Sequence, residues 1–226
     1  MTCDKNPEKI TEMFDEISSY YDKMNNLISL GTHLIIKKTA IKNLKIRPNS
    51  YILDLCCGTG DFTKIIAGIE PSSKIIGLDA SENMIKTAKQ KNPQKIFIQG
   101  DCTKLIFKEN EFDYITIGFG LRNIENRQKA INEIYRTLKT GGKFLHLDFG
   151  NHTISGKLFN FLVLAIISCL GKIYNLNKDS YKYLIQSKNE YPKPENLIRE
   201  FENYGFKLIK RKDFLFGAIS FQILQK

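Results

Sequence analysis

A glycine-containing stretch between two aspartates is the part of this sequence best suited to bind a small ligand. Residues 54–61 read Asp-Leu-Cys-Cys-Gly-Thr-Gly-Asp and follow the apolar residues 51–53. Glycines here let the chain turn from a strand into a helix whose N-terminus approaches the ligand, which in dinucleotide sites is a pyrophosphate. Asp61 instead puts a carboxylate at the start of the expected helix. The stretch therefore suits a cationic ligand with ammonium and sulfonium groups; the alternative is that its aspartates only cap the helix.

Two further acids stand at the ends of the next expected strands. Asp79 ends residues 74–79, at about the 20-residue spacing at which a carboxylate binds ribose hydroxyls. Asp101 follows the strand expected at 95–99 and can accept a hydrogen bond from an exocyclic amine such as that of adenine. Each acid alone could merely cap the following helix. Because ligands of parallel sheets bind outside the carboxyl ends of the strands, the acids together predict a nucleoside site.

Three separate motifs resemble those of one enzyme family. The first is F-D-E-I-S-S-Y-Y-D-K-M-N-N at residues 14–26 with S-L-G at 29–31, and the second is F-G-L-R-N-I at 119–124. The third is S-Y-K-Y-L at 180–184 with Ser187 and Pro192. Together they resemble the motifs of the menaquinone/ubiquinone biosynthesis C-methyltransferases, within the class I methyltransferases that use S-adenosylmethionine. The likeness spans residues 14–192, which is nearly the whole chain.

The resemblance implies S-adenosylmethionine as the methyl donor and a prenylated quinol, most simply demethylmenaquinol, as the acceptor. The positions that bind the cofactor in the family are Thr59, Asp79, Asp101, Cys102 and Gly118, and Asp54, Gly58 and Gly60 are expected to join them. The benzoquinol of the ubiquinone pathway and another small or lipid-like acceptor stay open as alternatives. A binding or scaffold protein without activity conflicts with the intact acids and glycines.

Arg122 and Asn123 are the expected catalytic residues. A quinol carbon becomes nucleophilic when a ring hydroxyl loses its proton or the developing phenolate is stabilised. Arg122 would stabilise the oxyanion or orient a water and Asn123 would position the ring, and the resemblance points to the same pair; the alternative is loop capping with a surface salt bridge. Weaker candidates are His33, His146 and His152 as bases, Asp148 as an acceptor contact, and Tyr21, Tyr181 and Tyr183 as stacking residues. Cys56 and Cys57 are expected only to pack.

The sequence departs from the family mainly around the acceptor. Ile36 stands where many members have tryptophan, and residues 150–152 replace the usual S-K-P. Gly118 replaces a serine, so only a backbone contact survives there. The segment expected to cover the acceptor site, residues 151–192, is also shorter than usual. These changes leave methyl transfer as the prediction and leave the quinol open.

Composition and charge exclude several classes of protein. With 226 residues, 42% of them hydrophobic and 26% charged, the chain suits a globular protein and not a disordered one. Five cysteines without a C-x-x-C motif support neither a zinc site nor a disulfide framework, and they favour the cytoplasm. The N-terminus lacks the pattern of a signal peptide. A net charge of +10 fits nucleic acid, an anionic membrane or a solvated surface, but the lysines form no long block and no RNA-binding module is found, so no nucleic-acid partner is expected.

An apolar run at residues 158–170 lies in the expected acceptor cover. It is shorter than the roughly 20 residues that a transmembrane helix needs. It could line a channel for the prenyl tail or make a peripheral contact at the inner face of the membrane; the alternative is an ordinary core helix. A homodimer is a further open expectation.

Strands and helices alternate along the chain. This predicts an α/β fold with a doubly wound, mostly parallel seven-stranded sheet and a C-terminal antiparallel hairpin, which is the Rossmann-like class I methyltransferase fold. One domain, residues 1–226, is expected, with an N-terminal helical cover at 7–44. Helices are expected at 7–23, 32–44, 62–69, 81–91, 127–139 and 194–204, and strands at 51–55, 74–78, 95–99, 114–118, 143–148, 206–213 and 218–225. Gly141 and Gly142 are expected to end the helix at 127–139 as a C-cap.

Overall fold

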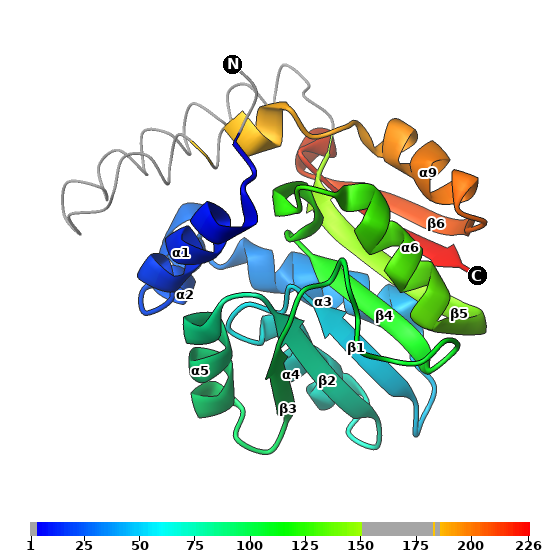
Figure 1. Cartoon of the computed structure of the whole chain (residues 1–226), viewed down its shortest axis with the longest axis horizontal. Helices are drawn as coiled ribbons and strands as arrows, with labels where there is room; N and C mark the ends of the chain where they lie inside the picture. Colours follow the sequence, from blue (N-terminus) through cyan, green and yellow to red (C-terminus); the bar gives the residue numbers. More distant parts are fainter. Residues whose placement is uncertain (1–3, 151–182, 184–185) are drawn as a thin grey trace.

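A seven-stranded sheet organises the chain, whose computed structural model describes residues 4–150, 183 and 186–226 (Figure 1). The strands are β1 Tyr51–Leu55, β2 Lys74–Asp79, β3 Ile96–Gln99, β4 Phe112–Gly118, β5 Leu138–Phe149, β6 Lys207–Phe214 and β7 Ile219–Gln225. Their order is β3-β2-β1-β4-β5-β7-β6, with β1 to β5 parallel and β7 antiparallel to both neighbours. This confirms the predicted fold. The strand order reverses between β1 and β4, which is where such sheets bind ligands.

Helices cover both faces of the sheet. They are α1 Pro7–Ile17, α2 Tyr21–Ser29, α3 Thr32–Leu44, α4 Asp61–Ile69, α5 Glu82–Lys91, α6 Arg127–Thr137 and α9 Pro194–Asn203, with short 3₁₀ turns η1 Leu121–Asn123 and η2 Leu215–Gly217. Figure 1 shows α6 and α9 on one face and α3 and α4 on the other. Each pair packs on its own hydrophobic cluster.

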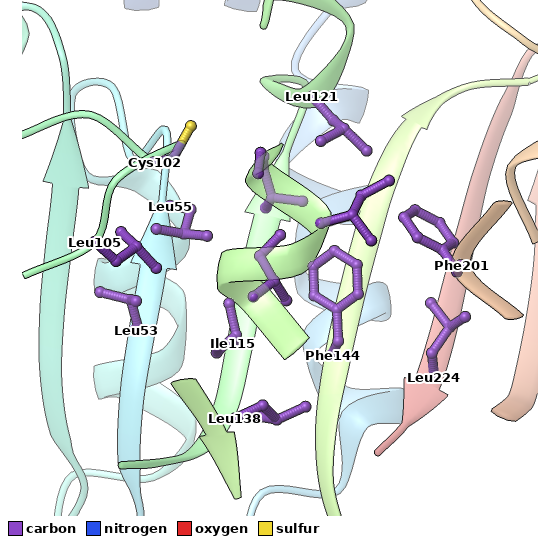
Figure 2. Packing of buried hydrophobic residues seen from close by; sticks show 14 of the residues in the cluster. Leu53, Leu55, Cys102, Leu105, Ile115, Leu121, Leu138, Phe144, Phe201 and Leu224 are labelled. Atoms are coloured by element: carbon purple, nitrogen blue, oxygen red, sulfur yellow. The ribbon is translucent and has the colours of Figure 1, made fainter. Parts of the chain in front are cut away.

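The cluster beneath α6 and α9 joins strands to helices across one face of the sheet. Figure 2 shows three side chains from the strands, those of Leu55 in β1, Ile115 in β4 and Phe144 in β5. Leu121 of η1 and Phe201 of α9 belong to the same cluster. All five side chains are fully buried. Full burial of such a side chain contributes about 1.5–3 kcal/mol each. The carboxyl ends of these strands are thereby held in fixed positions relative to one another.

Two local predictions were wrong. The helix expected at 7–23 is two helices: α1 ends at Ile17, and Tyr20, with φ −118° and ψ 2°, departs from the helical conformation before α2 begins. Gly141 and Gly142 do not cap a helix. The helix ends at Thr137, and Gly141, with φ +77°, lies in an irregular part of β5 where its N–H donates to the carbonyl of Lys226. Pairing with the C-terminal strand thus overrides the local glycine signal.

Candidate active site

A cavity of about 370 Å³ opens at the carboxyl ends of the central strands. It is lined by six residues predicted from the sequence, which are Gly58, Asp79, Asp101, Cys102, Gly118 and Asn123. Phe14 of α1 and Tyr21 of α2 line it from the opposite side, so the N-terminal helices form one wall. Its volume lies in the range of small-molecule sites.

The glycine turn after β1 is held by Asp79. Gly58 and Gly60 have φ of +53° and +87°, which glycine adopts without steric cost. The Asp79 carboxylate accepts the N–H of Gly58 at 2.8 Å and the N–H of Ser81 at 3.0 Å. Burial raises the pKa of Asp79 above its ordinary value. One carboxylate therefore shapes the turn, caps the approach to α5 and lines the cavity.

Asp54 lies beneath the turn and outside the cavity lining. Its side chain is 1% exposed and accepts the N–H and hydroxyl of Thr63, at 3.0 and 2.8 Å, and the hydroxyl of Thr116 at 2.8 Å. Burial raises the pKa of Asp54 to about 6. Asp54 thus joins β1, α4 and β4, and its place is that of a residue that positions the turn.

Thr59 and Gly60 also lie outside the cavity lining. Thr59 is 2% exposed, and its hydroxyl donates to Asp22 of α2 at 2.6 Å. Lys91 at the end of α5 forms an ion pair with the same Asp22 at 2.5 Å. These contacts attach the N-terminal cover to the glycine turn.

Asp15 attaches the cover at a second point. Its carboxylate accepts the backbone N–H of Asn83 at 3.0 Å and the hydroxyl of Ser81, at the start of α5. Sequence reasoning did not single out Asp15 or Asp22 as site residues, although both stand in the N-terminal motif. The signal was their place in that motif, whereas their partners could be found only from the fold.

Asp101 and Gly118 line the cavity in different ways. Asp101 is exposed and accepts the N–H and hydroxyl of Thr103, at 2.8 and 2.7 Å. A Cβ at Gly118 would lie 2.8 Å from the Phe62 ring, so β4 can approach α4 this closely only with glycine. The backbone of Gly118 is therefore what this position presents to the cavity.

Arg122 and Asn123 occupy the turn after β4. Asn123 lines the cavity, and its Oδ1 accepts the hydroxyl of Tyr183 at 3.2 Å. Arg122 is 4% exposed and lies behind it, where Nη1 donates to Asp148 at 3.0 Å and also to the carbonyl of Phe119. The pair with Asp148 is buried and not at the surface, whereas the bond to the Phe119 carbonyl is the loop capping that the alternative expected.

A second cation joins Arg122 beside Phe149. The Arg122 guanidinium lies 4.9 Å and the Lys188 ammonium 5.0 Å from the centroid of the Phe149 ring. Lys188 is 8% exposed, and burial, aided by the charge of Arg122, lowers its pKa to about 8. Asp148 is fully buried among these groups. Two buried cations and one carboxylate therefore lie behind the turn that follows β4.

The weaker candidates separate clearly. His146 is buried: its Nδ1 donates to Oε1 of Gln222 at 2.5 Å, its Nε2 accepts the Tyr191 hydroxyl at 2.9 Å, and burial lowers its pKa. His33 lies outside the cavity lining. Tyr21 and Cys56 line the cavity, and Cys57 packs in a small cluster with Phe97. The residues Tyr181 and His152, and the apolar run 158–170, lie outside the described residues.

In the described ranges, no helix combines the length and apolar character needed to cross a bilayer.

Known proteins similar to this chain were found by sequence and by structure. A sequence model of the ubiE/COQ5 methyltransferase family matches residues 2–226. The demethylmenaquinone methyltransferase of Staphylococcus carnosus is 38% identical over 222 residues, covering 96% of this chain and 92% of the relative. That of Anoxybacillus flavithermus is 34% identical and covers 97% and 96%. The solved phosphoethanolamine N-methyltransferase 2 of Haemonchus contortus, in complex with S-adenosyl-L-methionine, has the same fold, with a TM-score of 0.63, 18% identity, and 84% and 52% coverage.

Proposed function

The chain belongs to the ubiE/COQ5 methyltransferase family, and from that premise we propose that it transfers a methyl group from S-adenosylmethionine to a ring carbon of demethylmenaquinol. Its relatives named demethylmenaquinone methyltransferase support this acceptor over the benzoquinol of the ubiquinone pathway. The observation that carries the proposal is the charge of the cavity.

The cavity is acidic, although the chain as a whole is basic. The charged residues of its described lining are Asp79, Asp101 and Glu125 against Lys129. A pyrophosphate or a nucleic-acid backbone would be repelled there, whereas a cationic nucleoside would be attracted. Leu78 and Met84 supply apolar surface beside Asp79. S-adenosylmethionine, which combines a sulfonium, an ammonium, a ribose and an adenine, fits this arrangement.

We assign the cofactor roles from these positions. The Asp79 carboxylate, fixed by Gly58 and Ser81, would accept the ribose hydroxyls, and Asp101 would accept the adenine amine. Cys102 and Gly118 would contact it from the strand ends. Asp54, Thr59 and Gly60, which lie outside the cavity lining, would act without touching the cofactor, by fixing the glycine turn.

The bound cofactor supplies an electrophilic methyl group on its sulfonium. Phe14 and Tyr21 close one wall of the cavity and exclude water from the reacting groups, which favours a near-attack geometry. Asn123 faces the cavity and would orient a ring oxygen of the quinol. Arg122 holds the Phe119 carbonyl and pairs with Asp148, so together with Lys188 it leaves one net positive charge behind the turn, and this charge would stabilise the developing phenolate without touching it.

The partners are proposals of the same kind. A quinol with a prenyl tail resides in lipid, which supports a peripheral position at the inner face of the membrane, with the run 158–170 as one contact. The homodimer stays a prediction, which light scattering of the purified protein would check.

The direct test counts methyl groups. Purified protein is incubated with radiolabelled S-adenosylmethionine and, in parallel, with reduced demethylmenaquinone, a reduced ubiquinone precursor and total RNA. We expect label in the demethylmenaquinone extract. Arg122→Ala should lower kcat with little change in cofactor affinity, and because it leaves Asp148 buried without its partner, thermal unfolding verifies that the variant is folded. Asp79→Asn should weaken cofactor binding. Arg47→Ala, at an exposed arginine away from the cavity, is the matched control; no label in any quinol despite cofactor binding would contradict the proposal.

A further inference from the structure

Four aliphatic side chains are exposed where α2 meets α3, and we call this surface the α2–α3 corner. They are Leu27 (42% exposed), Leu30 (82%), Leu34 (40%) and Ile35 (67%). Single exposed aliphatic residues are common and need no explanation, whereas a contiguous group usually marks an interaction site. Elsewhere among the described residues, Ile96, Ile106 and Ile209 are exposed singly along the sequence, and Leu215 and Phe216 form a neighbouring pair.

The backbone at the tip of the corner is strained. Leu30 has φ +48° and is followed by Gly31 with φ +75°. A left-handed conformation is unfavourable for leucine, because its Cβ approaches the following carbonyl oxygen. Leu30 is nonetheless the most exposed residue of the corner, so burial within this chain does not offset the strain. The conformation ends α2, because the N–H groups of Leu30 and Gly31 donate to the carbonyls of Leu27 and Asn26, and it turns the chain so that the Leu30 side chain projects from the surface.

Exposed lysines accompany the corner, and the two carboxylates beside α3, those of Asp22 and Asp61, are each paired with a lysine. Between Asp22 and Asp54 the sequence has no acidic residue but contains Lys23, Lys37, Lys38, Lys42, Lys45 and Arg47. Lys37 is buried and paired with Asp61 at 2.8 Å. Lys38 and Lys42 are exposed and follow Leu34 and Ile35 along α3 by about one and two helical turns. Aliphatic tips flanked by lysines match the composition of surfaces that bind anionic bilayers.

Pairing with a second copy of the chain suits the corner less well. A two-fold dimer would place the same patch against itself. The lysines would then face lysines, and residues 23–53 contain no carboxylate to neutralise them. A bilayer instead offers an apolar interior for the leucines and anionic headgroups for the lysines.

The corner also lies close to the cavity. Tyr21, the first residue of α2, lines the cavity, and Leu30 follows the last residue of the same helix. At 1.5 Å per residue, about 13 Å separates them along the axis. Figure 1 shows α1 and α2 together at one side of the molecule. A bilayer in contact with the corner would therefore lie near the wall of the cavity that the N-terminal helices form.

We propose that the α2–α3 corner docks the protein on an anionic bilayer, with Leu30 and Ile35 inserted among the lipids and Lys38 and Lys42 facing the headgroups. The use of this contact rests on the proposed function, because docking brings the cavity to an acceptor dissolved in lipid. The contact itself requires neither cofactor nor acceptor.

The test is flotation of the full chain with vesicles, without substrate. Vesicles of phosphatidylcholine mixed with phosphatidylglycerol should bind the protein, and vesicles of phosphatidylcholine alone should bind it at least tenfold more weakly. Leu30→Asp with Ile35→Asp should lower the partition coefficient at least tenfold, and Lys38→Glu with Lys42→Glu should do the same and reduce its salt dependence. Ile106→Asp is the matched control, since Ile106 is 83% exposed between Lys104 and Lys108 but lies away from the corner, between β3 and β4.

Two results would overturn the docking proposal. The first is absence of binding by the unsubstituted protein to anionic vesicles, and the second is equal binding by the protein and both double variants. Thermal unfolding and binding of S-adenosylmethionine verify that each variant is folded. Methyl transfer to a quinol in detergent micelles is measured separately, so loss of docking and loss of the proposed activity are distinguished.

Discussion

The hydroxyl of Thr59 donates to the carboxylate of Asp22 at 2.6 Å, and this contact joins the glycine turn after β1 to the first turn of α2. Lys91 at the end of α5 binds the same carboxylate at 2.5 Å. At the other end of α5, Asp15 accepts from Ser81 and Asn83. The N-terminal helices are thus attached at both ends of α5, on either side of Asp79 and its turn. The same contacts therefore hold both the wall of the cavity and the glycine turn in place.

We expect Thr59→Val to weaken binding of S-adenosylmethionine about tenfold. Valine has nearly the same shape but cannot donate to Asp22, and a hydrogen bond to a charged group contributes about 1.5–3 kcal/mol. Titration calorimetry measures the dissociation constant. Thr39→Val is the matched control, because the Thr39 hydroxyl bonds the Ile35 carbonyl of its own helix, at 2.8 Å. An unchanged dissociation constant in Thr59→Val would show that the cover closes without this bond.

Two glycine substitutions should shift stability in opposite directions. In Gly118→Ala the new Cβ would lie 2.8 Å from the Phe62 ring, and such overpacking costs about 1–3 kcal/mol. Gly68 lies in α4 with nothing within 4 Å of the added Cβ, so Gly68→Ala should stabilise by up to about 1 kcal/mol. Urea unfolding of both variants gives the free energies. A stable Gly118→Ala would mean that Phe62 can move aside.

Loss of Asp148 should be far more costly than loss of an exposed partner. Asp148→Ala leaves the buried guanidinium of Arg122 without its carboxylate, and breaking such a pair costs about 3–5 kcal/mol. Asp213→Ala removes a similar contact to Arg211, at 2.8 Å, on a partly exposed strand and should cost under about 1 kcal/mol. Chemical unfolding compares the two. Equal losses would contradict the placement of Arg122 in the interior.

His33 should make the protein less stable in acid. Burial lowers its pKa to about 4, below the ordinary 6.5, so between these values the unfolded chain binds a proton that the folded chain does not. The free energy of unfolding should therefore fall as the pH drops from about 6.5 to about 4. His33→Gln keeps a donor for Asn26, which the ring nitrogen Nε2 contacts at 3.0 Å, and should remove that slope.

Comparing the pH dependence of stability in the unsubstituted protein and in His33→Gln isolates the contribution of His33. Asp54, whose pKa is raised to about 6, acts in the opposite sense, since the folded state takes up its proton first and gains stability as the pH falls through 6. Asp54 is present in both proteins, so its contribution cancels in the difference between their curves. Parallel pH profiles would contradict the assignment to His33.

Local patterns in the sequence were sufficient for the strands, most helices and the glycine turn. Apolar runs that end in Asp79 or before Asp101 mark the strand ends, and glycine at positions 58 and 60 permits the positive φ that the turn uses. Local patterns were not sufficient at two places, the helix expected at 7–23 and the glycines expected to cap a helix. The helix that apolar periodicity favoured at 7–23 is interrupted at Tyr20, and Gly141 belongs to β5, where its N–H pairs with the carbonyl of Lys226.

The sequence by itself determined the order of the elements, the family and the acids at the strand ends, because these depend on neighbouring residues and on motif spacing. Only the tertiary structure decided which polar side chains face the cavity. Asp54 points inward to Thr63 and Thr116, whereas Asp79, at the end of the adjacent strand, lines the cavity. The pairing of Asp22 with Thr59 likewise depends on how helices from distant parts of the chain pack, since a hydrogen bond forms only where folding brings its two atoms together.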